Sequence, residues 1–123
     1  MKNQLKQLYT EMQPSLLDFK ESQFVRVVHF FNKQNPQGGL TIAYKPQICN
    51  TKGFPSGKFA EVSLAWCNPR DRYDRKLGEL IALNKLERGE SVLLPIYASG
   101  TPVQELRRMF RYMESYNNNG FWF

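Results

Sequence analysis

The chain has 123 residues, with 17 Lys and Arg against 11 Asp and Glu and a formal net charge of +6. This length fits one domain, 1–123, and 41% hydrophobic residues suffice for a core, which excludes wholesale disorder. No apolar run approaches the roughly 18 residues of a membrane span, and the first residues lack the apolar segment of a signal peptide. The composition predicts a small, basic, cytoplasmic protein that does not enter a membrane.

The first third of the chain predicts a helix and then a hairpin. Residues 5–12 have the apolar spacing of an amphipathic helix, which Pro14 interrupts. Residues 24–31 are β-branched and aromatic and predict a strand buried on both faces. The turn residues of 35–39 connect it to a strand at 40–45, with Leu40, Ile42 and Tyr44 on one face and Thr41, Ala43 and Lys45 on the other.

A third strand follows a long connection at 46–57. Residues 58–67 alternate, which places Ala60, Val62, Leu64 and Trp66 inward and Glu61 and Ser63 outward. Residues 68–71 read as a helix start, with Asn68 as the N-cap. Gly89 should end that helix.

A strand at 92–97 and a last helix from Thr101 complete the chain. Pro95 confines that strand to an edge or a bulge, because proline cannot donate to a ladder. The order α-β-β-β-α-β-α predicts a single α+β domain. In it an antiparallel β-meander precedes helix, strand and helix, and the helices pack on one face of the sheet.

Catalytic and metal-binding patterns are missing from the sequence. Cys49, Cys67 and His29 have no metal-ligand spacing, so we expect no metal and no cofactor. His29 lies in an apolar run, where a hydrogen-bonded strand histidine is more common than a catalytic base. Glu61 is the only strand carboxylate, and the sequence therefore predicts a protein that is not an enzyme, unless His29, Glu61 and a basic residue converge in a pocket.

Positive charge is concentrated in the first half of the chain. No acidic residue lies between Ser22 and Ala60, a span that contains five cations: Arg26, Lys33, Lys45, Lys52 and Lys58. Such a segment attracts phosphate or an acidic protein surface. Aromatic residues interleave with these cations, and Phe54, in a glycine-rich basic loop, is the one we expect to be exposed. Scattered lysines that only keep the protein soluble are the alternative.

The densest charge cluster lies at 70–76. On the expected helix, Arg72, Arg75, Lys76 and Glu79 would share one side. The helix start could then present arginines and main-chain donors to phosphate. The alternative is a solvated helix face with salt bridges, such as an Arg75–Glu79 pair.

The chain ends in three aromatic residues, Phe121, Trp122 and Phe123. We expect them to fold back onto the core, and docking on a partner or on a second copy of the chain is the alternative.

Residues 66–78, with Ile81-Ala82 and 86–89, resemble a pattern in small uncharacterised proteins of bacteriophages and related mobile elements. The pattern is a strand followed by Cys, Pro, basic-Asp, an aromatic residue, basic-basic, Gly, Ile-Ala and Arg-Gly. The resemblance covers about a fifth of the chain and carries no activity. It implies a phage-like accessory protein in a bacterial cytoplasm, of the kind that binds DNA or RNA or disables a host protein.

Two functions remain. The first is non-enzymatic binding of nucleic acid, single-stranded DNA or RNA, with little sequence specificity. The second is a protein-binding inhibitor or adaptor that docks on a host nucleic-acid-handling enzyme; a homodimer is compatible with both. Both functions use the same predicted contacts: Arg26, Lys45, Lys52, Phe54, Lys58, Arg70, Arg72, Arg75 and Lys76.

Overall fold

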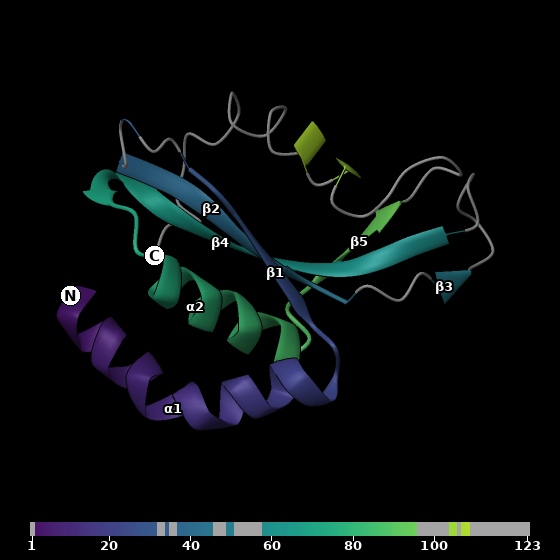
Figure 1. Ribbon diagram of the computed structural model, residues 1–123, viewed down its shortest axis with the longest axis horizontal. Coiled ribbons are helices and arrows are strands. Elements are labelled where there is room, and N and C mark those ends of the chain that lie inside the picture. Colours follow the sequence, from purple (N-terminus) through teal and green to yellow (C-terminus); the bar gives the residue numbers. More distant parts are fainter. Residues whose placement is uncertain are drawn as a thin grey trace.

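Two helices cover one face of a five-stranded antiparallel sheet (Figure 1). The computed structural model describes residues 2–31, 34, 37–45, 49–50, 58–95, 104–105 and 107–108, with only the main chain described at 2–3, 49–50, 58–59 and 95. The elements are α1 (Lys2–Ser22), β1 (Arg26–Phe30), β2 (Gln37–Tyr44), β3 (Cys49–Asn50), β4 (Lys58–Arg72), α2 (Arg75–Glu87) and β5 (Val92–Pro95). The α+β class predicted from the sequence is confirmed.

Helix α1 runs without a break through Pro14, so the predicted interruption is wrong. Pro14 is exposed, and solvent can satisfy the carbonyl group to which proline cannot donate. Two residues further on, Leu16 is fully buried against α2 and the sheet. Tertiary packing of this face therefore maintains the helix across the proline.

The predicted hairpin of β1 and β2 is confirmed, with Arg26 opposite Tyr44 and Phe30 opposite Leu40. The expectation that 24–31 is buried on both faces is wrong. β1 begins only at Arg26, its residues are exposed or half-buried, and Phe24 lies outside the strand and is 73% exposed. The reason is position, since β1 is the last strand of the sheet on its side.

Strand β4 lies at the centre of the sheet and extends five residues beyond the predicted strand end. It pairs with β2 along most of its length. Phe59 is in register with both Cys49 of β3 and Pro95 of β5, so these two strands lie on opposite edges of β4. Within the described part of the chain β5 pairs only with β4, which agrees with the edge position that Pro95 predicted.

Both faces of the sheet are buried, one by small residues and one by large ones. The helices cover the face that carries the small residues Gly39, Thr41, Ala43, Ser63, Ala65 and Cys67. The other face carries Leu40, Ile42, Tyr44, Val62 and Trp66. Ser63, predicted to face outward, is only 2% exposed, because the face it belongs to lies under the helices.

Helix α2 ends as predicted at Gly89. The amide of Gly89, at φ +79°, donates to Leu86 O, and the amide of Glu90 donates to Lys85 O. These are the two hydrogen bonds of a Schellman motif. The four described residues between 104 and 108 are helical. The rest of the predicted last helix, the connection at 46–48 and 51–57, and the terminal aromatic residues lie outside the described residues.

None of the helices in the described ranges is long and apolar enough to cross a membrane.

Candidate functional site

The seven predicted contact residues that the structure describes fall into two groups at opposite ends of the sheet. Arg26 lies opposite Tyr44, which is in register with Val62 near the start of β4. Arg70 and Arg72 close the same strand, and Arg75 and Lys76 open α2. The two groups are separated by the length of β2, from Tyr44 to Gln37, which is roughly 23 Å. They do not form one surface.

The first group carries little uncompensated charge where it is described. Lys45 forms an ion pair with Glu61 across the sheet, Nζ to Oε1 at 3.3 Å. Lys58 is the first residue of β4, and its side chain is not among those described. Lys52 and Phe54 lie outside the described residues. Arg26 is therefore the one exposed cation that the described part of this group offers.

The second group sits where β4 turns into α2. Residues 68–72 continue β4, so Asn68 is not the helix N-cap and Arg72 does not share a helix side with Arg75. Asn68 Oδ1 instead accepts from the main-chain amide of Arg70 at 2.9 Å. Asp74 is the N-cap, and its Oδ1 accepts from the amide of Leu77 at 3.0 Å. Asn68 and Asp74 are both residue types that cap helices. Asp74 is the N-cap because it lies three residues before Leu77, whose amide needs an acceptor in the first turn of the helix.

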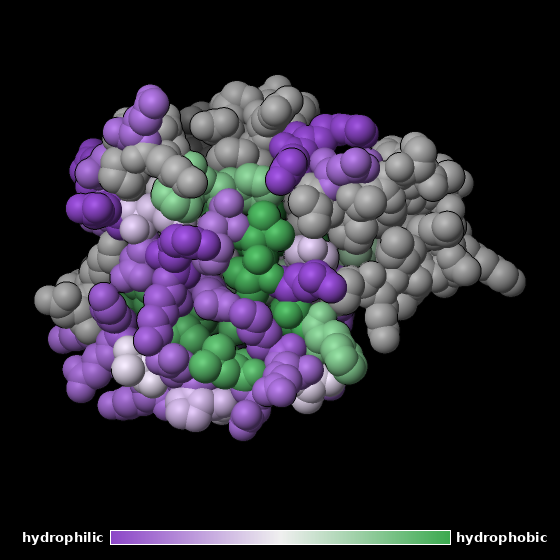
Figure 2. Space-filling view, viewed as in Figure 1, coloured by the Kyte–Doolittle hydropathy of each residue, from purple (hydrophilic) through white to green (hydrophobic). Residues whose placement is uncertain are grey.

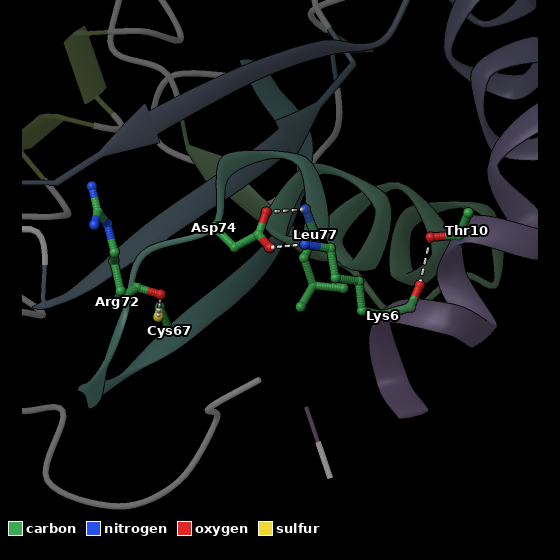
Figure 3. Close-up of polar contacts among 6 residues, drawn as sticks. All are labelled: Lys6, Thr10, Cys67, Arg72, Asp74 and Leu77. Carbon is green, nitrogen blue, oxygen red and sulfur yellow. Dashed lines mark hydrogen bonds and ion pairs between the residues drawn. The ribbon is translucent and has the colours of Figure 1, made fainter. Parts of the chain in front are cut away.

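Four cations are exposed within the seven residues of this turn: Arg70, Arg72, Arg75 and Lys76. Asp74, one of the two carboxylates among them, also contacts Lys6 of α1, with Oδ2 at 3.3 Å from Nζ. In Figure 3 the Arg72 side chain points away from this contact. The predicted Arg75–Glu79 pair is wrong, because Glu79 pairs with Lys20 of α1. We call Arg70, Arg72, Arg75 and Lys76, together with neighbouring Phe31, the junction surface.

Tyr73 anchors this surface to the sheet. Its hydroxyl lies 2.7 Å from His29 Nδ1 and donates to Leu40 O at 3.3 Å, and Thr41 Oγ1 contacts both His29 and Tyr73. The Phe31 ring stacks on the Tyr73 ring, with centroids 4.7 Å apart and planes inclined by 26°. Phe31 is half-buried, so part of its ring remains accessible next to Tyr73.

The groups of this polar cluster are neutral near pH 7. Burial lowers the pKa of His29, and the cations of Arg75 and Lys20 act in the same direction, against the carboxylate of Glu79. Burial raises the pKa of Tyr73 to about 12, although its hydrogen bond with Thr41 opposes this change. The positive charge of the junction surface therefore comes from its arginines and its lysine, without a contribution from His29.

The predicted strand histidine is confirmed, since His29 is half-buried and hydrogen-bonded. It does not converge with Glu61, which contacts Lys45 and accepts from Ser91 Oγ at 2.6 Å. Cys67 is buried as a thiol. In the described ranges no group of three His, Cys, Asp or Glu residues is placed to hold a metal ion.

Sequence reasoning missed the roles of Tyr73, Thr41 and Phe31. Tyr73 falls within the helix predicted to start at Asn68, and Phe31 falls at the end of the strand predicted at 24–31. The position of Tyr73 in the sequence between Arg72 and Arg75 was the available indication that a ring lies among the cations.

Comparison with models of known protein families, with curated proteins and with solved structures finds no match to the chain.

Proposed function

We propose that the protein is a non-enzymatic binding protein for single-stranded nucleic acid and that the junction surface holds the strand. The observation that carries the proposal is the grouping of four exposed cations beside a half-exposed aromatic ring. Cations that follow a phosphate backbone, with aromatic rings on which bases stack, bind single strands with little sequence preference. Folding brings these two features together, because Phe31 is distant in sequence from the 70–76 segment.

The residue types and positions of the four cations of the junction surface favour phosphate binding. Arginine is planar and binds phosphate through two hydrogen bonds, and three of the four cations are arginines. Arg75 and Lys76 are also the first residues of α2, where the helix dipole and main-chain amides favour an anion. The carboxylate of Asp74 is engaged by Lys6 and by the Leu77 amide, which reduces its repulsion of phosphate.

The aromatic partner is rigidly placed. Tyr73 is held by hydrogen bonds to strands β1 and β2, and Phe31 stacks on its ring. A base that stacks on the outer face of Phe31 therefore meets a surface that is already ordered. Such stacking contributes about 1–3 kcal/mol per base.

The setting we propose is the one implied by the resemblance at 66–89, a phage-like accessory protein acting in a bacterial cytoplasm. The motif that carries the resemblance includes Tyr73 and all four cations of the junction surface.

Fluorescence anisotropy with a labelled single-stranded oligonucleotide across a salt series tests the proposal. We expect the magnitude of the slope of log affinity against log salt to fall by about 0.7 for each phosphate contact removed. The double variant Arg72→Ala/Arg75→Ala should therefore flatten the slope by about 1.4, and Phe31→Ala should weaken binding with little change in slope.

The control is Arg26→Ala/Arg88→Ala, which removes the same charge from exposed positions outside the junction surface. It should keep most of the affinity and slope. Absence of binding at low salt contradicts the proposal, and so does a control that loses as much affinity as the junction variant.

A further inference from the structure

Phe24 has a main-chain conformation that disfavours phenylalanine. It has φ +53° and follows α1, where the Val25 amide donates to Lys20 O at 2.9 Å and the Phe24 amide to Glu21 O at 3.3 Å. The same Schellman arrangement ends α2, and there the position is occupied by Gly89 at φ +79°. Glycine adopts this left-handed conformation without strain, whereas a residue with a bulky side chain does not. The fold would be satisfied by glycine at residue 24.

Packing within the chain does not explain the phenylalanine either. The Phe24 side chain is 73% exposed, the largest exposure among the large hydrophobic residues in the described part of the chain. Strained and exposed residues of this kind concentrate at contact sites, where the strain is retained for function. Phe24 therefore has the features of a residue kept for an interaction.

A groove lies next to Phe24, where α1 meets β1. It is an open depression of about 540 Å³, and it is lined by Leu17, Lys20, Glu21, Phe24, Val25 and Arg26. Leu17 is 40% exposed on the helix side of this groove. Figure 2 shows apolar surface over β1 and toward α1, with hydrophilic side chains on both sides. The groove can hold an apolar side chain.

The strand that borders the groove has an open edge. β1 is terminal in the sheet order, and no strand within the described residues pairs with its outer side. An edge strand presents a row of main-chain donors and acceptors, which an extended segment satisfies by adding a strand. The groove and this edge are consecutive along the chain, so one extended segment can use both.

The charge of Arg26 indicates what kind of residue fits opposite it. Arg26 is exposed at the start of β1 and forms no ion pair with a described carboxylate. A residue added opposite Arg26 is most favourable when it is acidic. A second copy of this chain also carries a net charge of +6, and the long-range repulsion between two such chains disfavours self-pairing.

We propose that the outer edge of β1 and the adjoining groove bind an extended acidic segment of a partner protein. The segment adds a strand to β1, places an apolar side chain between Leu17 and Phe24, and sets a carboxylate opposite Arg26. The groove and Arg26 lie at the end of the sheet away from Arg70 and Arg72, so peptide binding at residues 24–26 can be tested separately from nucleic-acid binding.

The probe is a synthetic eight-residue peptide that alternates glutamate with valine or isoleucine and carries one phenylalanine. NMR titration of the isotope-labelled chain should show chemical-shift changes concentrated at 24–30. A peptide with lysine in place of each glutamate should bind at least tenfold more weakly. Arg26→Glu should reverse this preference, because it inverts the charge at the edge.

Phe24→Gly is the decisive variant. It should weaken peptide binding at least tenfold while the thermal midpoint stays the same or rises, since the left-handed conformation suits glycine. The matched control is Leu8→Ala, which removes another exposed apolar side chain of α1 and should leave peptide affinity within twofold. Arg72→Ala/Arg75→Ala should also leave it unchanged.

Four results overturn the proposal. The first is no binding of the acidic peptide at millimolar concentration, and the second is undiminished binding by Phe24→Gly. A lower midpoint for Phe24→Gly would show that this side chain packs on its own chain. Shift changes at 24–26 caused by an oligonucleotide, or at 24–30 caused by raising the concentration of the chain alone, would assign the surface to nucleic acid or to a second copy.

Discussion

The Tyr73 ring occupies space that is available only because residue 39 is a glycine. A Cβ atom on Gly39 would lie 2.6 Å from the Tyr73 ring, and Gly39 has φ +138°, a conformation that residues with a Cβ rarely adopt. The ring therefore packs directly on the main chain of β2, and the hydroxyl reaches His29 and Leu40 O. The glycine pair at 38–39, expected in a turn, in fact lies within β2, where Gly39 seats the residue that positions Phe31.

His29 should make stability depend on pH. Its pKa is lowered by folding, so between its folded value and its ordinary value of about 6.5 the unfolded chain binds a proton that the folded chain does not. The stabilising contribution is complete above pH 6.5 and is lost as the pH falls through the folded pKa. We expect the free energy of unfolding to decrease from pH 7 to pH 5.

Urea unfolding of the native chain and of His29→Asn at intervals across this range measures the effect. Asparagine can keep a polar atom near the position of Nδ1 but does not titrate. The two stability curves should converge toward pH 5 and separate above pH 6.5. Parallel curves would show that His29 does not carry the dependence.

At the scale of elements, the two candidate N-caps of α2, Asn68 and Asp74, should differ in their contribution to stability. Asp74→Ala removes the acceptor for the Leu77 amide and the ion pair with Lys6, and should lower the free energy of unfolding by about 1–2 kcal/mol. Asn68→Ala removes only an exposed contact with the Arg70 amide and should cost less than about 0.5 kcal/mol. Chemical denaturation of both variants gives the comparison, and a larger loss for Asn68→Ala would place the helix start where the sequence pattern predicted it.

The segment between Asn68 and Asp74 shows which structural features neighbouring residues can predict and which they cannot. The hairpin, the alternation in β4 and the glycine end of α2 depend on neighbouring residues, and the sequence predicted all three. Asn68 and Asp74 are both good caps, and the choice depends on how far β4 pairs with β2. That pairing continues to Arg72 opposite Gln37, a long-range contact that no local pattern contains.

At the scale of the whole molecule, the same limit applies to the candidate site. Arg70, Arg72, Arg75 and Lys76 were predicted together because chain neighbours stay close in any fold. Arg26 was grouped with them, but strand order and the length of β4 separate it from them. Phe31 and His29 join the junction through contacts with Tyr73 that span more than forty residues, so neither could be assigned to it.

The two faces of the sheet differ in the size of their side chains more than in polarity, and this difference determines which face the helices cover. Alternation in β4 was interpreted as inward apolar and outward polar residues, whereas the two faces differ in size. Ala43, Ser63 and Ala65 lie under the helices, and their small side chains allow α1 and α2 to approach the sheet closely. The leucines of α2 supply the apolar volume of this layer.

Close approach of the helices predicts a specific sensitivity. Ala65 is fully buried at the centre of the small face, so Ala65→Leu must displace α2 or strain its side chains. We expect a loss of about 1–3 kcal/mol in the free energy of unfolding, measured by denaturant titration. The control is Leu64→Met on the opposite face, which conserves volume and should cost less than about 1.5 kcal/mol. If Ala65→Leu is as stable as the native chain, the helices do not pack closely on this face, and residue size does not determine which face they cover.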